Sequence, residues 1–334
     1  MAISILICDD SALARKQLSR VIPLSWGAKI EFAQDGWDAI AKLEVDSYDL
    51  LFLDLTMPEL DGYGTLEQIN IRKINTQVVV VSGDIQPKAQ LRVSELGAKA
   101  FIKKPLDKAT LISTLTSIGI HPERQLAYSP QPVMPIQLRR RDVYLEVANV
   151  AIGRAADSLA RHFDVFVNMP LPNVNLFEMS ELQMTLRHLA SNEDMSGVCQ
   201  GFSGEGIAGE ALVLLSDSSV SDLVKLMDYP ESNDTSLELE LLMDVSNILV
   251  GAFLKGIGEQ SEVRFFQSAP VLLGQHISID SVLESTKGSF NRIMAFEVSY
   301  NIDNTNIKCD MLLMIVDESL PILDNKLAYL LDDE

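Results

Sequence analysis

The stretch that decides the fold of the first 120 residues is a run of four apolar residues that ends in a carboxylate, Leu50-Leu51-Phe52-Leu53-Asp54. Its apolar residues do not alternate with polar ones. A second run of this kind is Val78-Val79-Val80-Val81. Strands with such a pattern are buried on both faces, as the central strands of a parallel sheet are when helices cover both sides. The two runs therefore predict a doubly wound α/β fold.

Short apolar segments alternate with amphipathic ones on both sides of these runs, up to residue 120. The predicted strands are Ile3–Cys8, Ile30–Ala33, Leu50–Leu53, Gln77–Val81 and Ala100–Ile102. The predicted helices are Ser11–Val21, Gly36–Leu43, Gly62–Ile69 and onward, Pro87–Leu96 and Asp107–Ser117. Five βα units of this kind predict a five-stranded parallel sheet that binds its ligands outside the carboxyl ends of the strands.

Polar side chains follow four of the predicted strands. Asp9 and Asp10 come just after the first strand, Asp54 after the third, Ser82 at the end of the fourth and Lys104 after the fifth. All of these places lie on one edge of a parallel sheet, and carboxylates crowded there repel one another unless a cation lies among them. Mg²⁺ suits such a site because it takes a few carboxylates and exchanges its waters for phosphate oxygens. The set predicts phosphoryl transfer to a carboxylate.

Each of these residues also has an ordinary explanation when it is taken alone. Asp10 or Ser11 can cap the next helix, Ser82 can belong to a turn, and Lys104 can be a solvated tip. The coincidence of five such residues at the ends of four strands favours a functional site.

The first 120 residues resemble the receiver domains of bacterial response regulators, which have the CheY-like fold. The matching stretches are Ile7-Cys8-Asp9-Asp10-Ser11, Leu53 to Gly62, Val81-Ser82-Gly83 and Phe101-Ile102-Lys103-Lys104-Pro105. The resemblance implies phosphorylation of Asp54 by a sensor histidine kinase. It also implies a Mg²⁺ ion held by Asp9, Asp10, Asp54 and the carbonyl of Thr56, a switch hydroxyl on Ser82, a phosphate-binding Lys104 and an aromatic switch residue at Phe101.

The composition limits the partners that the chain can have. It has 334 residues, 27 of them basic and 47 acidic, for a net charge of −20. Such acidity disfavours binding to nucleic acid and to anionic membranes, since both reward a basic surface. We expect no membrane span, because no apolar stretch approaches the ~20 residues required. The three cysteines are far apart, which with the absence of a secretion signal predicts a cytoplasmic protein.

A proline-rich polar segment interrupts the βα pattern and predicts three parts: a domain over 1–120, a linker over 121–140 and a second domain over 141–334. The basic run Arg139-Arg140-Arg141 is interpreted as part of the solvated linker, with a docking patch as the alternative.

The second domain looks like an internal repeat of an α/β unit with pseudo-twofold symmetry. The first half is predicted to contain a helix over Asp142–Arg161, extended segments over Asp164–Met169, Gly197–Phe202 and Gly209–Leu215, and a helix near Val220–Met227. In the second half Thr235 and Glu238 have capping-box spacing and open a helix through about Lys255. Extended segments over Val263–Gln267, Ile293–Tyr300 and Ile307–Val316 follow, and then a helix near Ile322–Leu331.

Both halves carry a carboxylate and an amide along one helical stripe. The first copy is Asp142, Glu146 and Asn149, at i, i+4 and i+7, with Pro172 after 22 intervening residues; the second is Glu240, Asp244, Asn247 and Pro270 at the same spacing. One copy alone is explained by a solvated helix face. The recurrence of the whole pattern favours function, because an amide can hold a water in line with a phosphorus atom and a carboxylate can pair with a lysine.

Residues 142–334 resemble the CheC, FliY and CheX group of chemotaxis phosphatases, whose motif is Asp/Ser-x-x-x-Glu-x-x-Asn followed after 22 residues by Pro. The resemblance implies that Glu146 contacts a receiver lysine and that Asn149 aligns the hydrolytic water, with no cofactor of the domain's own. The second copy departs, since Glu240 replaces Asp or Ser and Asp244 is one methylene shorter than Glu. Asn247 keeps the implied role there.

The sequence thus predicts a response regulator whose second domain is a protein aspartyl-phosphate phosphatase. Its substrate is either a separate phosphorylated receiver or the chain's own receiver, in cis or in a homodimer. The alternative is a non-catalytic adaptor, gated by phosphorylation of Asp54, that binds receivers or a flagellar-switch component. The sequence shows no basic helix-turn-helix pattern, which argues against a DNA-binding output domain.

Overall fold

A computed structural model describes residues 3–120, 138–178, 181, 184, 195–226, 235–274 and 292–331. The chain forms two compact units, Met1–Glu146 and Val147–Glu334. The boundary falls inside helix α6 (Arg140–Phe163), which begins at the last residue of the predicted linker. Linker residues 121–137 lie outside the described residues.

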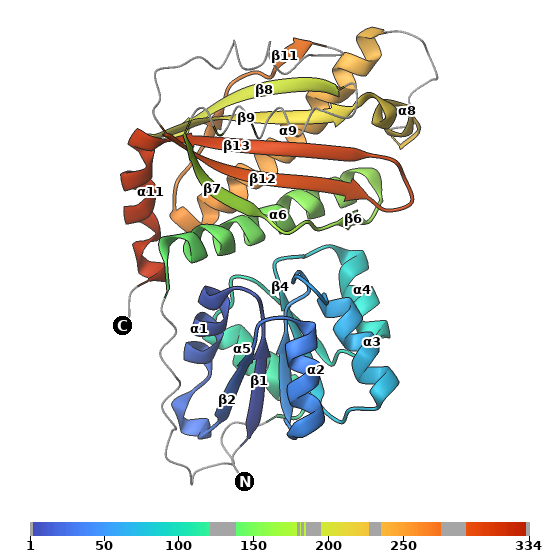
Figure 1. Cartoon of the computed structure of the whole chain (residues 1–334), viewed down its shortest axis with the longest axis vertical. Coiled ribbons are helices and arrows are strands. Elements are labelled where there is room, and N and C mark those ends of the chain that lie inside the picture. The colour runs from blue at the N-terminus through green and yellow to red at the C-terminus, as the bar shows by residue number, and fades with distance from the viewer. Residues whose placement is uncertain are drawn as a thin grey trace. The chain divides into compact units, whose positions relative to one another are not determined.

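The first unit contains a five-stranded parallel sheet of order β2-β1-β3-β4-β5. Helices cover both of its faces (Figure 1). The strands are β1 (Ser4–Cys8), β2 (Lys29–Ala33), β3 (Leu50–Leu53), β4 (Gln77–Ser82) and β5 (Ala100–Lys103). The helices are α1 (Ala12–Val21), α2 (Gly36–Val45), α3 (Gly62–Arg72), α4 (Pro87–Glu95) and α5 (Lys108–Ser117), with a 3₁₀ turn at Leu24–Trp26. The predicted doubly wound sheet is confirmed.

Burial explains why the two apolar runs form central strands. Every residue of Leu50–Leu53 is buried, and so is every residue of β4 after Gln77. Side-chain caps start the helices: the Ser11 hydroxyl accepts a hydrogen bond from the Ala14 N–H at 3.1 Å, and Asp35, Asp61 and Asp107 cap α2, α3 and α5 in the same way. The capping explanation is therefore right for Ser11.

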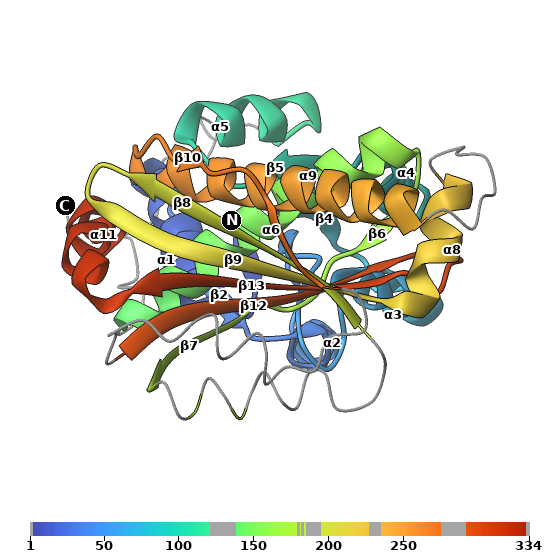
Figure 2. The ribbon, with the colours of Figure 1, turned by 90° about the horizontal axis from the view of Figure 1, so that it is seen from above.

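The second unit is built on an eight-stranded sheet whose described strand pairs are all antiparallel. Figure 2 shows α9 lying along one face of this sheet. The strands are β6 (Val167–Asn168), β7 (Asn173–Glu178), β8 (Met195–Gly204), β9 (Ile207–Ser216), β10 (Phe266–Gln267), β11 (Val271–Gly274), β12 (Arg292–Ile302) and β13 (Lys308–Val316). The helices besides α6 are α8 (Asp217–Leu226), α9 (Thr235–Ser261) and α11 (Leu320–Leu327), with 3₁₀ turns at Asp317–Ser319 and Ala328–Leu330. The sequence predicted an α/β domain here but did not predict that its strands pair in antiparallel fashion.

The two short strands of each half pair with the long strand of the other half. β6 and β7 pair with β12, whereas β10 and β11 pair with β8. The prolines of the repeated motif stand directly before β7 and β11, where a residue without an N–H costs no ladder hydrogen bond. Sequence reasoning missed β7 and β11. Helix α9 begins at Thr235, but the predicted capping side chains of Thr235 and Glu238 lie outside what the structure describes.

Helix α9 corrects the statement that no apolar stretch approaches membrane length. Its segment Leu239–Ser261 is 23 residues long and apolar enough to cross a bilayer by length and composition. The helix instead packs inside the second unit, since Leu249, Phe253 and Ile257 are buried. The Gln260 side chain also donates to the Val147 carbonyl of α6 at 3.0 Å. Its apolar composition is that of a core helix.

Candidate functional site

The parallel register brings the predicted carboxylates to one edge of the first sheet. Cys8 at the end of β1 pairs with Leu53 at the end of β3, so Asp9 and Asp54 emerge side by side. Ligand atoms of Asp9, Asp10 and Asp54 lie within 4.8 Å of one another. The sequence therefore predicted this cluster correctly from strand ends alone.

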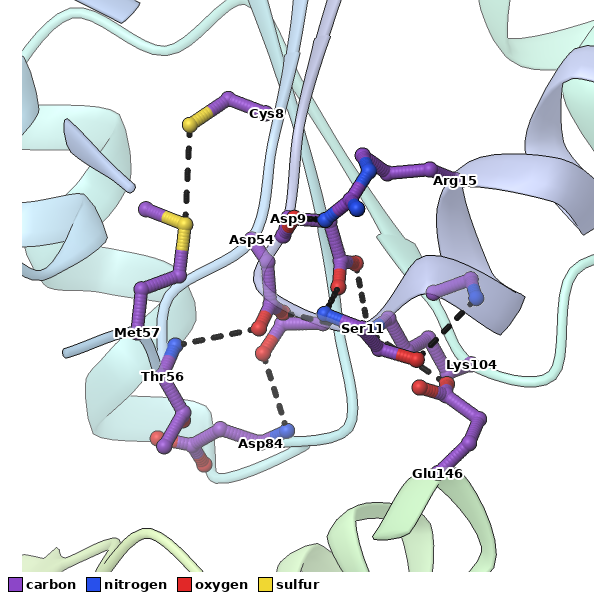
Figure 3. Close-up of polar contacts among 12 residues, drawn as sticks. Cys8, Asp9, Ser11, Arg15, Asp54, Thr56, Met57, Asp84, Lys104 and Glu146 are labelled. Atoms are coloured by element: carbon purple, nitrogen blue, oxygen red, sulfur yellow. Dashed lines mark hydrogen bonds and ion pairs between the residues drawn. The ribbon is translucent and has the colours of Figure 1, made fainter. Parts of the chain in front are cut away.

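Lys104 completes the cluster from the end of β5 (Figure 3). Its Nζ lies 2.8 Å from Asp9 Oδ2 and 3.6 Å from Asp54 Oδ1. The Asp9 carboxylate also accepts a hydrogen bond from the Ser11 N–H at 2.8 Å, and Asp54 accepts one from the Thr56 N–H at 3.3 Å. Asp9, Asp54 and Lys104 are all buried, so their charges interact in a poorly solvated site.

Burial raises the pKa of each carboxyl group in the cluster. The pKa of Asp9 rises to about 7 through burial, although Lys104 opposes the rise. Burial and the neighbouring Asp9 charge raise the pKa of Asp10 to about 7, and burial raises that of Asp54 to about 6. Burial lowers the pKa of Lys104, but Asp54 and Asp9 outweigh it and raise the pKa well above its usual value. The cluster holds one cation for three carboxyls and needs a further positive charge at neutral pH.

The donor set fits Mg²⁺. Oδ1 of Asp10 and Oδ1 of Asp54 are buried and have no hydrogen-bond partner among the described residues, although Asp54 Oδ1 lies 3.6 Å from Lys104 Nζ, so each can accept a metal ion. Mg²⁺ takes hard oxygen ligands and usually one or two carboxylates with waters and phosphate oxygens. Asp9, Asp10 and Asp54 would hold the ion, together with the predicted carbonyl of Thr56.

We expect Mg²⁺ to bind the chain at least about tenfold more weakly at pH 5.5 than at pH 8. The carboxyls with pKa values of about 7, 7 and 6 hold protons at the lower pH, and Mg²⁺ must displace them. Titration calorimetry at constant ionic strength measures the affinity. The Asp10→Asn chain should show a weaker dependence on pH, and equal affinities of the unmodified chain at both pH values would contradict the assignment.

The remaining predicted residues of the first unit lie around this edge. Ser82 is fully buried at the end of β4, and its hydroxyl accepts a hydrogen bond from the Asp84 N–H at 3.1 Å. Phe101 is half-buried in β5. Sequence reasoning missed Arg15, whose Nη1 donates to the Asp9 carbonyl at 2.5 Å. The sequence feature that could have pointed to Arg15 is its position in the helix that begins just after Asp9 and Asp10.

The first copy of the repeated motif lies on α6. Glu146, the last residue of the first unit, has its Oε1 3.4 Å from Lys104 Nζ (Figure 3). Oε2 of Glu146 and Oδ1 of Asn149 are buried without a hydrogen-bond partner among the described residues. Asp142 has a different role: its carboxylate accepts a hydrogen bond from the Arg139 N–H at 2.6 Å, which satisfies a free donor at the start of the helix.

The second copy lies on α9. Glu240 and Asn247 are exposed, and Asp244 is half-buried. The amide oxygen of Asn247 accepts a hydrogen bond from Gln200 at 2.9 Å. The two asparagines that the sequence treats as equivalent therefore differ in their contacts.

Comparison with known proteins identifies the first unit. Residues 5–116 match the family of the response regulator receiver domain. The chain is 32% identical over 116 residues to the chemotaxis protein CheY of Treponema pallidum, a match that covers 34% of this chain and 81% of that protein. It is 31% identical over 176 residues to a protein-glutamate methylesterase/protein-glutamine glutaminase of Rhodospirillum rubrum, with 52% of this chain and 45% of that protein covered, so it spans less than half of that relative.

Part of the chain is also similar to a solved structure. A chain in the crystal structure of the CheX–CheY–BeF₃–Mg²⁺ complex from Borrelia burgdorferi is 34% identical, with a TM-score of 0.33, over 35% of this chain and 88% of that one. Together with the acidic edge of the sheet, the sequence matches lead to one conclusion: through its receiver domain the chain belongs to the response regulator receiver family and is a two-component response regulator.

Proposed function

We propose that helix α6, which carries Glu146 and Asn149, acts with the second unit to hydrolyse the aspartyl-phosphate of a receiver domain, either at Asp54 of this chain or on a separate protein. The proposal starts from the position of Glu146 and Asn149 on one stripe of α6, three residues apart. It also rests on the resemblance of that stripe to the motif of the CheC, FliY and CheX phosphatases. A sensor histidine kinase in the cytoplasm would supply the phosphoryl group.

The observation that carries the proposal is the ion pair between Lys104 and Glu146. The two groups lie 3.4 Å apart and are both buried, so the pair is shielded from solvent. A buried ion pair costs desolvation and fixes the relative place of its partners more than it stabilises the fold. A carboxylate that selects the lysine beside a phosphorylation site is suited to recognising a receiver.

Hydrolysis also requires a group that aligns the attacking water, and Asn149 is suited to that role. Its side chain is buried, and its Oδ1 has no hydrogen-bond partner among the described residues. An amide offers an acceptor and a donor at fixed geometry, so it can hold one water in one orientation. Orienting the attacking group contributes a large share of the barrier reduction in phosphoryl transfer.

In the proposed reaction one bond to phosphorus forms and one breaks. The oxygen of the water held by Asn149 bonds to phosphorus, the bond between phosphorus and the Asp54 oxygen breaks, and Asp54 leaves as a carboxylate. The products are inorganic phosphate and the proton that the water loses. Lys104 offsets the negative charge on the phosphoryl oxygens. Asp9, Asp10 and Asp54 would hold Mg²⁺, which would supply further charge compensation when bound.

The test is phosphate release from a phosphorylated receiver in the presence of the chain. The proposal expects release faster than spontaneous hydrolysis, with many phosphates released per chain. The adaptor alternative expects binding of the receiver without faster release. Supplying the receiver on a separate protein, and then only on the chain itself, distinguishes the two sources of substrate.

A further inference from the structure

The strand register within the second unit makes positions 98 residues apart equivalent. Asn173 of β7 pairs with Glu297 of β12, and Val271 of β11 pairs with Cys199 of β8. Val271 lies 98 residues after Asn173, and Glu297 lies 98 residues after Cys199. The pairs Asn168–Asn301 and Phe266–Ser203 obey the same offset. Asn149 and Asn247 are also 98 residues apart, so their surroundings can be compared position by position.

Asn247 is held by a buried glutamine of β8. Nε2 of Gln200 donates to Asn247 Oδ1 at 2.9 Å and to the Ser268 carbonyl at 2.8 Å, and a longer contact joins it to Gln267 Oε1 at 3.4 Å. The Ser268 carbonyl can only accept a hydrogen bond, so the atom of Gln200 that faces it must be the donor Nε2. Because the same Nε2 also faces Asn247, the atom that Asn247 presents to it must be the amide oxygen. Both protons of Nε2 are used and Gln200 is only 2% exposed, so the amide oxygen of Asn247 stays hydrogen-bonded to β8.

At the equivalent place around Asn149, the part of the chain that the structure describes offers no such group. The position equivalent to Gln200 is Val298, which is 2% exposed and has no side-chain donor. The position equivalent to Ser268 is Pro170. In agreement with this, Oδ1 of Asn149 has no hydrogen-bond partner among the described residues, although it is buried. The internal repeat therefore keeps both asparagines, and among the described residues the amide oxygen has a hydrogen-bond partner in the second copy but not in the first.

We propose that the Asn247–Gln200 pair is a structural hydrogen bond that fixes α9 on β8, and that Asn149 alone aligns the hydrolytic water. This inference rests on the proposed phosphatase function and assigns it one site per chain. If the Asn247 amide turned to place a water, one proton of the buried Gln200 Nε2 would keep only the longer contact to Gln267 Oε1 at 3.4 Å. The loss of an acceptor for a buried donor is costly, so the pair persists. The shorter Asp244 is consistent with a second copy kept for folding.

The test compares Asn149→Ala with Asn247→Ala in the full chain, using phosphate release from a separate phosphorylated receiver and the melting temperature of the second unit. Asn247→Ala should leave the rate within about twofold and lower the melting temperature by about 3–6 °C, because one proton of the buried Gln200 Nε2 loses its near acceptor. Asn149→Ala should slow release at least about a hundredfold without lowering the melting temperature.

A third variant separates structure from catalysis. Adding Gln200→Val to Asn247→Ala reproduces the apolar residue found at Val298 and should recover most of the lost melting temperature, with the rate still unchanged. The inference is overturned if Asn247→Ala slows release tenfold or more, or if it leaves the melting temperature unchanged. If the unmodified chain releases phosphate no faster than spontaneous hydrolysis, the proposed function itself fails, and the inference about Asn149 fails with it.

Discussion

A chain that carries Glu146→Ala and Asn149→Ala together is expected to release phosphate from a phosphorylated receiver about 10²–10³-fold more slowly than the unmodified chain. The first change removes the carboxylate that lies 3.4 Å from Lys104, and the second removes the amide proposed to align water. Release of phosphate is followed with a coupled colorimetric assay at a fixed concentration of phosphorylated receiver.

The single variants should separate the two roles. Glu146→Ala should chiefly raise KM, because Glu146 is proposed to bind the receiver, whereas Asn149→Ala should chiefly lower kcat. The matched control is Asp157→Ala on the same helix, which removes only an exposed ion pair with Arg161 and should leave the rate unchanged. An unaltered rate in the double variant, with its fold intact by circular dichroism, would contradict the assignment of both residues.

Replacing Asp54 with asparagine is expected to reduce phosphorylation of the chain to background. Asp54 is the buried carboxylate beside Lys104 and one of the candidate metal ligands, and the amide that replaces it has no carboxylate oxygen to form an acyl phosphate. Incorporation of labelled phosphate from a small-molecule phosphodonor measures the loss. The control is Asp61→Asn, because Asp61 caps α3 and asparagine caps a helix equally well. Phosphorylation of the Asp54→Asn chain at an undiminished level would contradict the site.

The receiver unit could be predicted from the sequence because its signals are local. The apolar runs at Leu50–Leu53 and Val78–Val81 identify buried strands, and in a parallel sheet the residue after each strand lies at one edge. Asp9, Asp54 and Lys104 were therefore placed together without any knowledge of side-chain contacts. The structure added the distances, the burial that raises the carboxyl pKa values, and the contact of Arg15 with Asp9.

The second unit was less predictable because its pairing is not local. β7 follows Pro172 and pairs with β12, more than 100 residues later, so a short run gives little sign of its place in a sheet. The sequence also could not show that Asn149 and Asn247 differ in their hydrogen-bond partners. It depends on Gln200, which meets Asn247 only when α9 packs against β8. Spacing along the helix is the same in both copies and carries no information about that partner.

The most direct test of the central claim uses the Asp54→Asn chain as the catalyst, since it cannot be phosphorylated itself. Catalytic amounts are added to a separate phosphorylated receiver with Mg²⁺, and the initial rate of phosphate release is measured against chain concentration. The phosphatase proposal predicts a rate that rises linearly with the chain and many turnovers per molecule. A chain that binds the phosphorylated receiver but leaves phosphate release at the spontaneous rate at every concentration would contradict it.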